Sequence, residues 1–208
     1  SSAASDVYKR QERGTVIVMN PKTGEILAYA VYPTFDPNNY KKATPQQLKN
    51  WTLTDVFPPG STFKTITVAS AMDLGKINEH STVLDTGKTT IGKWEIKNYD
   101  YDVHPYPGNI TLEYLFEHSS NIGAINIART MTPKEFYDML KKFGFGAKTG
   151  IDLPGESSGL LPYYGNWDQG ILATMSYGYG TSVTAMQMIS AVQALANNGV
   201  RVTPHVIK

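Results

Sequence analysis

Apolar residues along the chain fall into short runs, separated by segments rich in glycine, proline and asparagine. The first two runs, residues 15–19 and 25–32, flank the turn Asn20-Pro21-Lys22-Thr23-Gly24. Two apolar runs joined by a proline and glycine turn predict a β-hairpin. Residues 33–51 are mostly polar and predict a loop with one short helix near residues 45–50.

Longer apolar stretches predict helices. Residues 61–74 follow Phe57-Pro58-Pro59-Gly60 and precede Gly75, which predicts a buried helix with Ser61 in its first turn. The sequence Thr132-Pro133-Lys134-Glu135 is typical of a capping box at a helix start. The other segments predict helices at 111–116, 121–131, 132–143 and 184–197, short strands and loops at 78–108, a loop at 144–166, and the start of a strand at 200–208.

Composition indicates one globular domain. The 208 residues are 41% hydrophobic, enough to bury a core. The 19 Lys and Arg nearly balance the 18 Asp and Glu, which argues against a nucleic-acid partner. The absence of cysteine excludes disulfides and thiol catalysis. The longest apolar run, residues 26–31, is too short to cross a membrane. Residues 1–13 are interpreted as a leader, linker or artefact, and residues 14–208 as the domain.

Candidate chemistry begins with Ser61-Thr62-Phe63-Lys64, an S-x-x-K pattern. Residues three apart share one face of a helix, so the Ser61 hydroxyl and the Lys64 amine can come within hydrogen-bond reach. Burial and the positive helix N-terminus favour the neutral amine, which can then act as a base. The pattern alone is weak, because it also describes a helix start with a surface lysine.

Ser119-Ser120-Asn121 lies between two predicted helices, 58 residues after Ser61. It supplies a second hydroxyl that can relay protons and an amide that can hold a substrate peptide bond. Taken alone, this triplet is more typical of a helix cap.

The order of the motifs resembles class B penicillin-binding proteins, most closely their septal, cell-division branch. The hairpin at 18–28 is similar to the first two sheet strands of that family. The motifs that carry the resemblance are Pro59-Gly60-Ser61-Thr62-Phe63-Lys64, Ser119-Ser120-Asn121, the segment 149–156, Ser176-Tyr177-Gly178-Tyr179-Gly180 and the segment 183–187.

The resemblance implies an α+β transpeptidase fold shared with serine β-lactamases, in which helices pack on an antiparallel sheet. It implies that Ser61 attacks the penultimate D-alanine of a peptidoglycan stem peptide and forms an acyl-enzyme, with Lys64 as base and Ser119 as proton carrier. Asn121 would orient the acyl chain, and Tyr177 and Gly178 are further candidate substrate-binding residues.

The same resemblance implies an amine acceptor from a neighbouring strand, acylation of Ser61 by β-lactam antibiotics, and no cofactor. It places the protein on the extracytoplasmic face of the plasma membrane, with an anchor upstream of this chain. Expected partners are a membrane glycosyltransferase and division-complex proteins.

Lys148-Thr149-Gly150 matches the family's third motif, which lies on a sheet strand. A loop rich in proline and glycine follows it, and it precedes the segment that should come before the true motif, so we interpret it as a chance match. The true motif is expected beyond Lys208. We therefore expect the sheet in this chain to be incomplete and the chain itself to be weakly active or inactive.

Other functions fit the sequence less well. Gly155-Glu156-Ser157-Ser158-Gly159 matches the nucleophile elbow of α/β-hydrolases, but Pro154 before it and Pro162 after it disfavour the required strand and helix. A serine β-lactamase, a β-lactam sensor and a catalytically degenerate scaffold of the same fold remain open alternatives. The four histidines, His80, His104, His118 and His205, lack ligand spacing, so no metal site is predicted.

Overall fold

The computed structural model describes residues 13–207, so the segment 1–12 interpreted as part of a leader lies outside it. These residues form two compact units, each built from segments that are distant in sequence. Unit 1 contains residues 13–55, 148–157 and 184–207, and unit 2 contains residues 56–147 and 158–183. No helix in residues 13–207 combines the length and the apolar character needed to cross a membrane.

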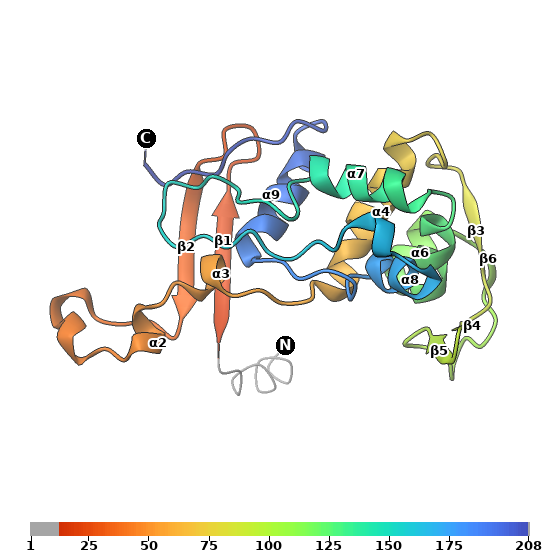
Figure 1. The fold of residues 1–208 in the computed structure, drawn as a ribbon, viewed down its shortest axis with the longest axis horizontal. Coiled ribbons are helices and arrows are strands. Elements are labelled where there is room, and N and C mark those ends of the chain that lie inside the picture. Colours follow the sequence, from red (N-terminus) through yellow and green to blue (C-terminus); the bar gives the residue numbers. More distant parts are fainter. Residues whose placement is uncertain (1–12, 208) are drawn as a thin grey trace. The chain divides into compact units, whose positions relative to one another are not determined.

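Unit 1 is a β-hairpin covered by a helix (Figure 1). Strands β1 (Gly14–Met19) and β2 (Ile26–Tyr32) pair antiparallel, with a bulge between Val18 and Met19. The predicted hairpin is therefore confirmed. Helix α9 (Ala185–Ala196) contacts β1 and α3 (Trp51–Thr54). The core of the unit is made of Ile26, Leu53, Ile151 and Met186.

The remaining elements of unit 1 are short. The 3-10 helix η1 (Pro37–Lys42) and α2 (Pro45–Leu48) occupy the polar segment after β2, and α2 confirms the predicted short helix. The C-terminal tail does not form the expected strand. Among residues 200–207, only His205 makes a bridge pairing, with Glu25. Its neighbours Val206 and Ile207 instead donate backbone N–H groups to the Asp152 carboxylate, at 2.8 Å each.

Unit 2 is a group of helices with two small antiparallel sheets beside it. The helical elements are η2 (Gly60–Phe63), α4 (Lys64–Asp73), α5 (Leu112–Glu117), α6 (Asn121–Ala128), α7 (Pro133–Lys142), η3 (Tyr164–Asn166) and α8 (Gln169–Ser176). Strand β3 (Thr82–Asp85) pairs with β6 (Gly108–Thr111), and β4 (Lys88–Ile91) pairs with β5 (Trp94–Lys97). The mixed α+β class is as predicted, with a fragmentary sheet.

Helix α6 is the centre of unit 2. It contacts α4, α8, β3 and β5, which explains why its sequence is apolar on nearly every face. Its buried residues include Ile122, Ile125 and Ile127. Helix α7 has the predicted capping box, because Thr132 N donates to Glu135 at 2.7 Å and Glu135 N donates to Thr132 Oγ1 at 3.2 Å. Helix α7 contacts α4, and α4 contacts α6, so the two helices that begin at the candidate site pack within one group.

Candidate active site

Ser61 lies in the tight turn that begins the buried helix, as predicted. The 3-10 helix η2 leads directly into α4, and Gly60 has a positive φ of 58°. The Gly60 N–H donates to Gly178 O at 3.1 Å, and the Thr62 hydroxyl donates to Pro59 O at 2.7 Å. Ser61 is exposed at this turn, while Phe63 beneath it is fully buried.

Lys64 is buried, with a relative exposure of 1%, and hydrogen-bonds to Ser119. Its Nζ donates to the Ser119 hydroxyl at 3.0 Å and also to the Ser119 carbonyl oxygen. Burial lowers the pKa of Lys64 from 10.5 to about 8, and the negative charge of Asp85 opposes that shift. A lysine with this pKa is neutral in a useful fraction of molecules near neutral pH, as a general base requires.

Ser119 occupies a strained turn between α5 and α6. Its φ is 50°, a left-handed value that is uncommon for residues other than glycine. Two backbone hydrogen bonds hold the turn, from Ser119 N to Phe116 O at 3.2 Å and from Ser120 N to Leu115 O at 2.9 Å. Strain of this kind is concentrated at functional sites, and here it points the Ser119 hydroxyl at Lys64.

A buried polar network fixes the start of α6. Asp85 accepts a hydrogen bond from Ser120 Oγ at 2.6 Å and two from Asn98 Nδ2 at 2.8 and 3.0 Å. Asn98 Oδ1 in turn accepts from the backbone N–H groups of Asn121 at 2.9 Å and Ile122 at 3.1 Å. Ser120 also caps α6 by accepting from Gly123 N at 2.8 Å. The middle serine of the triplet is therefore structural.

Asn121 is the first residue of α6, and its side chain reaches strand β5. Its Nδ2 donates to Lys97 O at 2.9 Å, which fixes the plane of the amide. The structure thus places Ser61, Lys64, Ser119 and Asn121 in one unit, with Lys64 and Ser119 in direct contact.

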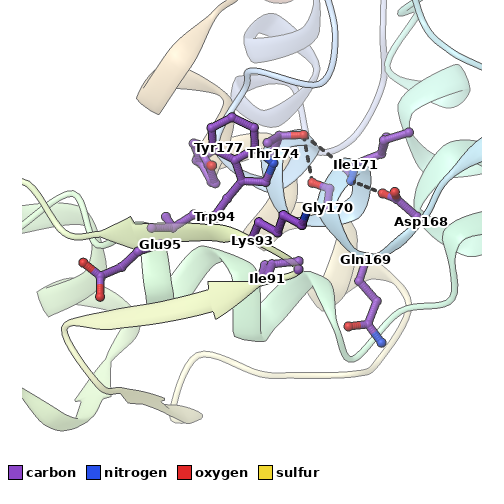
Figure 2. Close-up of a pocket in the computed structure, with 12 residues that line it drawn as sticks. Ile91, Lys93, Trp94, Glu95, Asp168, Gln169, Gly170, Ile171, Thr174 and Tyr177 are labelled. Atoms are coloured by element: carbon purple, nitrogen blue, oxygen red, sulfur yellow. Dashed lines mark hydrogen bonds between the residues drawn. The ribbon is translucent and has the colours of Figure 1, made fainter.

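Tyr177 borders a cavity of about 900 Å³ between the β4–β5 hairpin and α8 (Figure 2). Trp94 and Tyr177 bound it, and Ile91, Ile96 and Ile171 supply apolar lining. Burial raises the pKa of the Tyr177 phenol. Since Gly178 accepts from Gly60 N, the end of α8 connects this cavity with the turn that carries Ser61.

The two chance matches do not have the geometry of their motifs. Lys148-Thr149-Gly150 is irregular backbone, in which Glu156 accepts from Thr149 N at 2.7 Å, from Gly150 N at 3.1 Å and from the Thr149 hydroxyl. The segment 155–159 has neither a strand before it nor a helix directly after it. The expectation that neither segment forms its motif is confirmed.

Sequence reasoning missed Asp85 and Asn98. Asp85 comes two residues before the turn glycine Gly87, whose N–H it accepts at 2.7 Å, and that Asp-x-Gly pattern is the one local signal. It predicts a turn, and it does not predict the contact with Ser120. A further group, Asp100, His104 and His118, lies close enough to share a metal ion.

Comparison with known proteins agrees with this arrangement. The family model of the penicillin binding protein transpeptidase domain matches residues 14–208. Penicillin-binding protein PbpB of Mycolicibacterium smegmatis is 37% identical over 196 residues, covering 93% of this chain and 30% of that protein. Peptidoglycan D,D-transpeptidase FtsI of Escherichia coli is 36% identical over 193 residues, covering 93% of this chain and 32% of that protein.

A solved structure gives the same result in three dimensions. Penicillin binding protein 3 from Mycobacterium tuberculosis, complexed with aztreonam, has a TM-score of 0.85 and 34% identity, covering 94% of this chain and 43% of that one. The chain spans about a third of the length of the two curated relatives. From its sequence and its fold, the chain belongs to the penicillin-binding protein transpeptidase domain family.

Proposed function

We propose that this protein is a serine-type D,D-transpeptidase that cross-links peptidoglycan stem peptides through an acyl-enzyme on Ser61. The observation that carries the proposal is the buried amine of Lys64, which has a lowered pKa and donates a hydrogen bond to Ser119. Lys64 follows the exposed Ser61 by three residues, close to one helical turn. A nucleophile, a base and a second hydroxyl are the groups that acyl transfer needs. The relatives whose names include D,D-transpeptidase support the same reaction.

In the acylation step, neutral Lys64 accepts the proton as Ser61 Oγ attacks the penultimate D-alanine carbonyl. The tetrahedral intermediate collapses when Ser119 passes a proton from Lys64 to the nitrogen of the terminal D-alanine, which leaves. In the second step an amine of a neighbouring stem peptide attacks the ester, and its proton returns to Ser61 by the reverse route. The Ser61 backbone N–H lies in the first turn of η2, where N–H groups have no acceptor within the helix, and it is suited to stabilising the oxyanion.

The cavity beside Tyr177 is the part of the site suited to the rest of the stem peptide. Its apolar lining and its two aromatic side chains, Trp94 and Tyr177, offer contacts along a peptide, and Asn121 lies at the adjoining strand β5. Trp94 is 79% exposed, so replacement by alanine should leave the fold intact. We expect Trp94→Ala to raise KM for a stem-peptide donor severalfold with little change in kcat.

The family resemblance extends the proposal to the cellular setting. β-Lactams would acylate Ser61 because their amide imitates the D-alanyl-D-alanine bond. The protein would work at the extracytoplasmic face of the plasma membrane, in septal cross-linking, beside a membrane glycosyltransferase and other division proteins.

The test of this function is release of D-alanine from a donor peptide ending in D-Ala-D-Ala, together with mass analysis of products formed with an amine acceptor. It uses a form of the protein that extends past Lys208, where the third motif is expected. We expect D-alanine release and a cross-linked product, both abolished in Ser61→Ala. Release without cross-linking, in the presence of excess acceptor, would indicate a hydrolase. Neither product from folded protein would indicate a degenerate scaffold.

A further inference from the structure

We propose that Asp100, His104 and His118 form a binding site for a divalent transition metal such as Zn²⁺. Within the part of the chain that the structure describes, one potential ligand atom from each of these side chains lies within 4.8 Å of the other two. Two imidazoles and one carboxylate are a frequent protein ligand set for Zn²⁺, with water in the remaining position. The spacing of the histidines in the sequence gave no sign of it, because His104 and His118 are brought together by the fold.

The backbone positions two of the ligands before any metal binds. The segment 98–104 folds into a turn in which Val103 N and His104 N both donate to Asp100 O, at 2.9 and 2.8 Å. That turn places Asp100 and His104 on the same side of the loop. Its first residue, Asn98, is held by the buried Asp85, so the loop is attached to a rigid part of unit 2.

The third ligand, His118, lies at the end of helix α5, outside the 98–104 loop. His118 is the C-cap residue of helix α5, and its ring stacks on Tyr114 with 3.9 Å between ring centroids. The His104 ring meets it edge-on, with 5.3 Å between centroids. Fixed ring orientations reduce the entropy lost when a metal is bound.

The His118–Asp100 contact has nearly the separation of two metal ligands. His118 Nδ1 and Asp100 Oδ2 lie 2.9 Å apart. Ligand bonds of about 2.0–2.1 Å at a tetrahedral angle put two ligand atoms about 3.3 Å apart, so only a small opening of the pair is required. His118 and Asp100 are 30% and 21% exposed and His104 is exposed, which leaves a path for a metal from solvent.

The metal site adjoins the residues of the proposed reaction. His118 directly precedes Ser119. Ser119 has the left-handed φ, and its hydroxyl accepts a hydrogen bond from Lys64 Nζ. A metal would tie the 98–104 loop to that turn. The binding site itself does not depend on the proposed function, and its test uses metal binding alone.

The experiment is calorimetric titration of the metal-free protein with Zn²⁺, in parallel with His104→Ala, Asp100→Asn and the control His80→Ala. His80 is a suitable control because its imidazole is 87% exposed and its ring nitrogen Nε2 lies beside the exposed carboxylate of Glu79. We expect saturable 1:1 binding in the parent and in His80→Ala, weakened at least about tenfold in His104→Ala and in Asp100→Asn.

Co²⁺ provides an independent readout, because nitrogen and oxygen ligands from the protein change its visible absorption. We expect that change in the parent and its loss in His104→Ala. His104 is exposed, so this variant should unfold at the same temperature as His80→Ala, which thermal melting verifies. Absence of saturable Zn²⁺ binding, or equal affinity in His104→Ala and His80→Ala, would overturn the proposal.

Discussion

Lys64 is the residue whose protonation state controls the proposed chemistry, because a serine hydroxyl is a weak nucleophile without a base. Its pKa of about 8 is set by burial, against the opposing charge of Asp85. We therefore expect the second-order rate constant for Ser61 acylation by benzylpenicillin to rise with pH and to level off above about 8. The measurement is acylation rate against pH by stopped-flow fluorescence.

The variant Lys64→Arg separates basicity from charge. A guanidinium does not lose its proton in this range, so acylation should fall by at least about 10²-fold at every pH and lose its pH dependence. A parent rate that stays constant as the pH passes through the pKa of Lys64 would show that another group is the base.

Asn98 contributes to stability through hydrogen bonds that its replacement leaves unsatisfied. Asn98→Ala removes the acceptor for two backbone N–H groups of α6 and a donor to the buried Asp85. The free energy of unfolding should fall by at least about 2 kcal/mol, measured by urea denaturation. Asn109→Ala, at an exposed position of β6, should change it by less than about 0.5 kcal/mol. Equal effects of the two variants would contradict the role assigned to the network.

Local sequence predicts some contacts of the candidate site and not others. Ser61 and Lys64 are three residues apart, and helical periodicity is enough to predict that they share a face. Asp85 lies 13 residues from Asn98 and 35 from Ser120, so their contacts depend on how β3, β5 and α6 come together. No local pattern carries that information.

At the scale of elements, the end of α8 supports the turn that begins η2. Gly178 has a φ of 84°, and a Cβ there would lie 2.6 Å from Gly60 N and would also contact Gly60 O. We expect Gly178→Ala to displace the Ser61 turn and to slow benzylpenicillin acylation at least about tenfold.

Gly75 provides the matched control for that substitution. It has a φ of 67° at the end of α4, but a Cβ there would meet nothing within 4 Å. Gly75→Ala therefore carries a similar backbone strain of about 1–2 kcal/mol and should leave the acylation rate unchanged. A similar loss of rate in both variants would mean that strain alone, and no contact with Gly60, explains the effect.

Elements with strong end signals were predicted well, and elements without them were missed. The capping box at Thr132 and the glycine stop after α4 gave the bounds of two helices to within a few residues. Helix α8 was not predicted. Its N-cap is Asp168, but its second residue is Gly170, and a glycine in the first turn obscures the helix signal. The segment 200–207 has strand-like composition, but the His205 bridge is its only strand pairing.

At the scale of the whole molecule, unit 1 depends on three segments that are far apart in the chain. Met186 of α9 is fully buried against Ile26 of β2, Leu53 of α3 and Ile151 of the loop. Local patterns predicted the hairpin and the helix, but not their packing together. We expect Met186→Ala to lower the free energy of unfolding by about 2–5 kcal/mol, measured by urea denaturation.

Met72 is the matched control, because it lies on α4 with 40% of its surface exposed. Met72→Ala should change the free energy of unfolding by less than about 0.5 kcal/mol. If Met186→Ala were equally mild, the core assigned to unit 1 would be incorrect.

Ser61 as an acyl-forming nucleophile is tested by the intact mass of the protein, in a form that extends past Lys208, after incubation with benzylpenicillin. We expect a stable adduct of one drug molecule, mapped to Ser61 by peptide analysis and absent in Ser61→Ala. Rapid loss of the adduct with release of hydrolysed drug would indicate a β-lactamase. The absence of any adduct on well-folded protein would show that Ser61 does not form an acyl-enzyme.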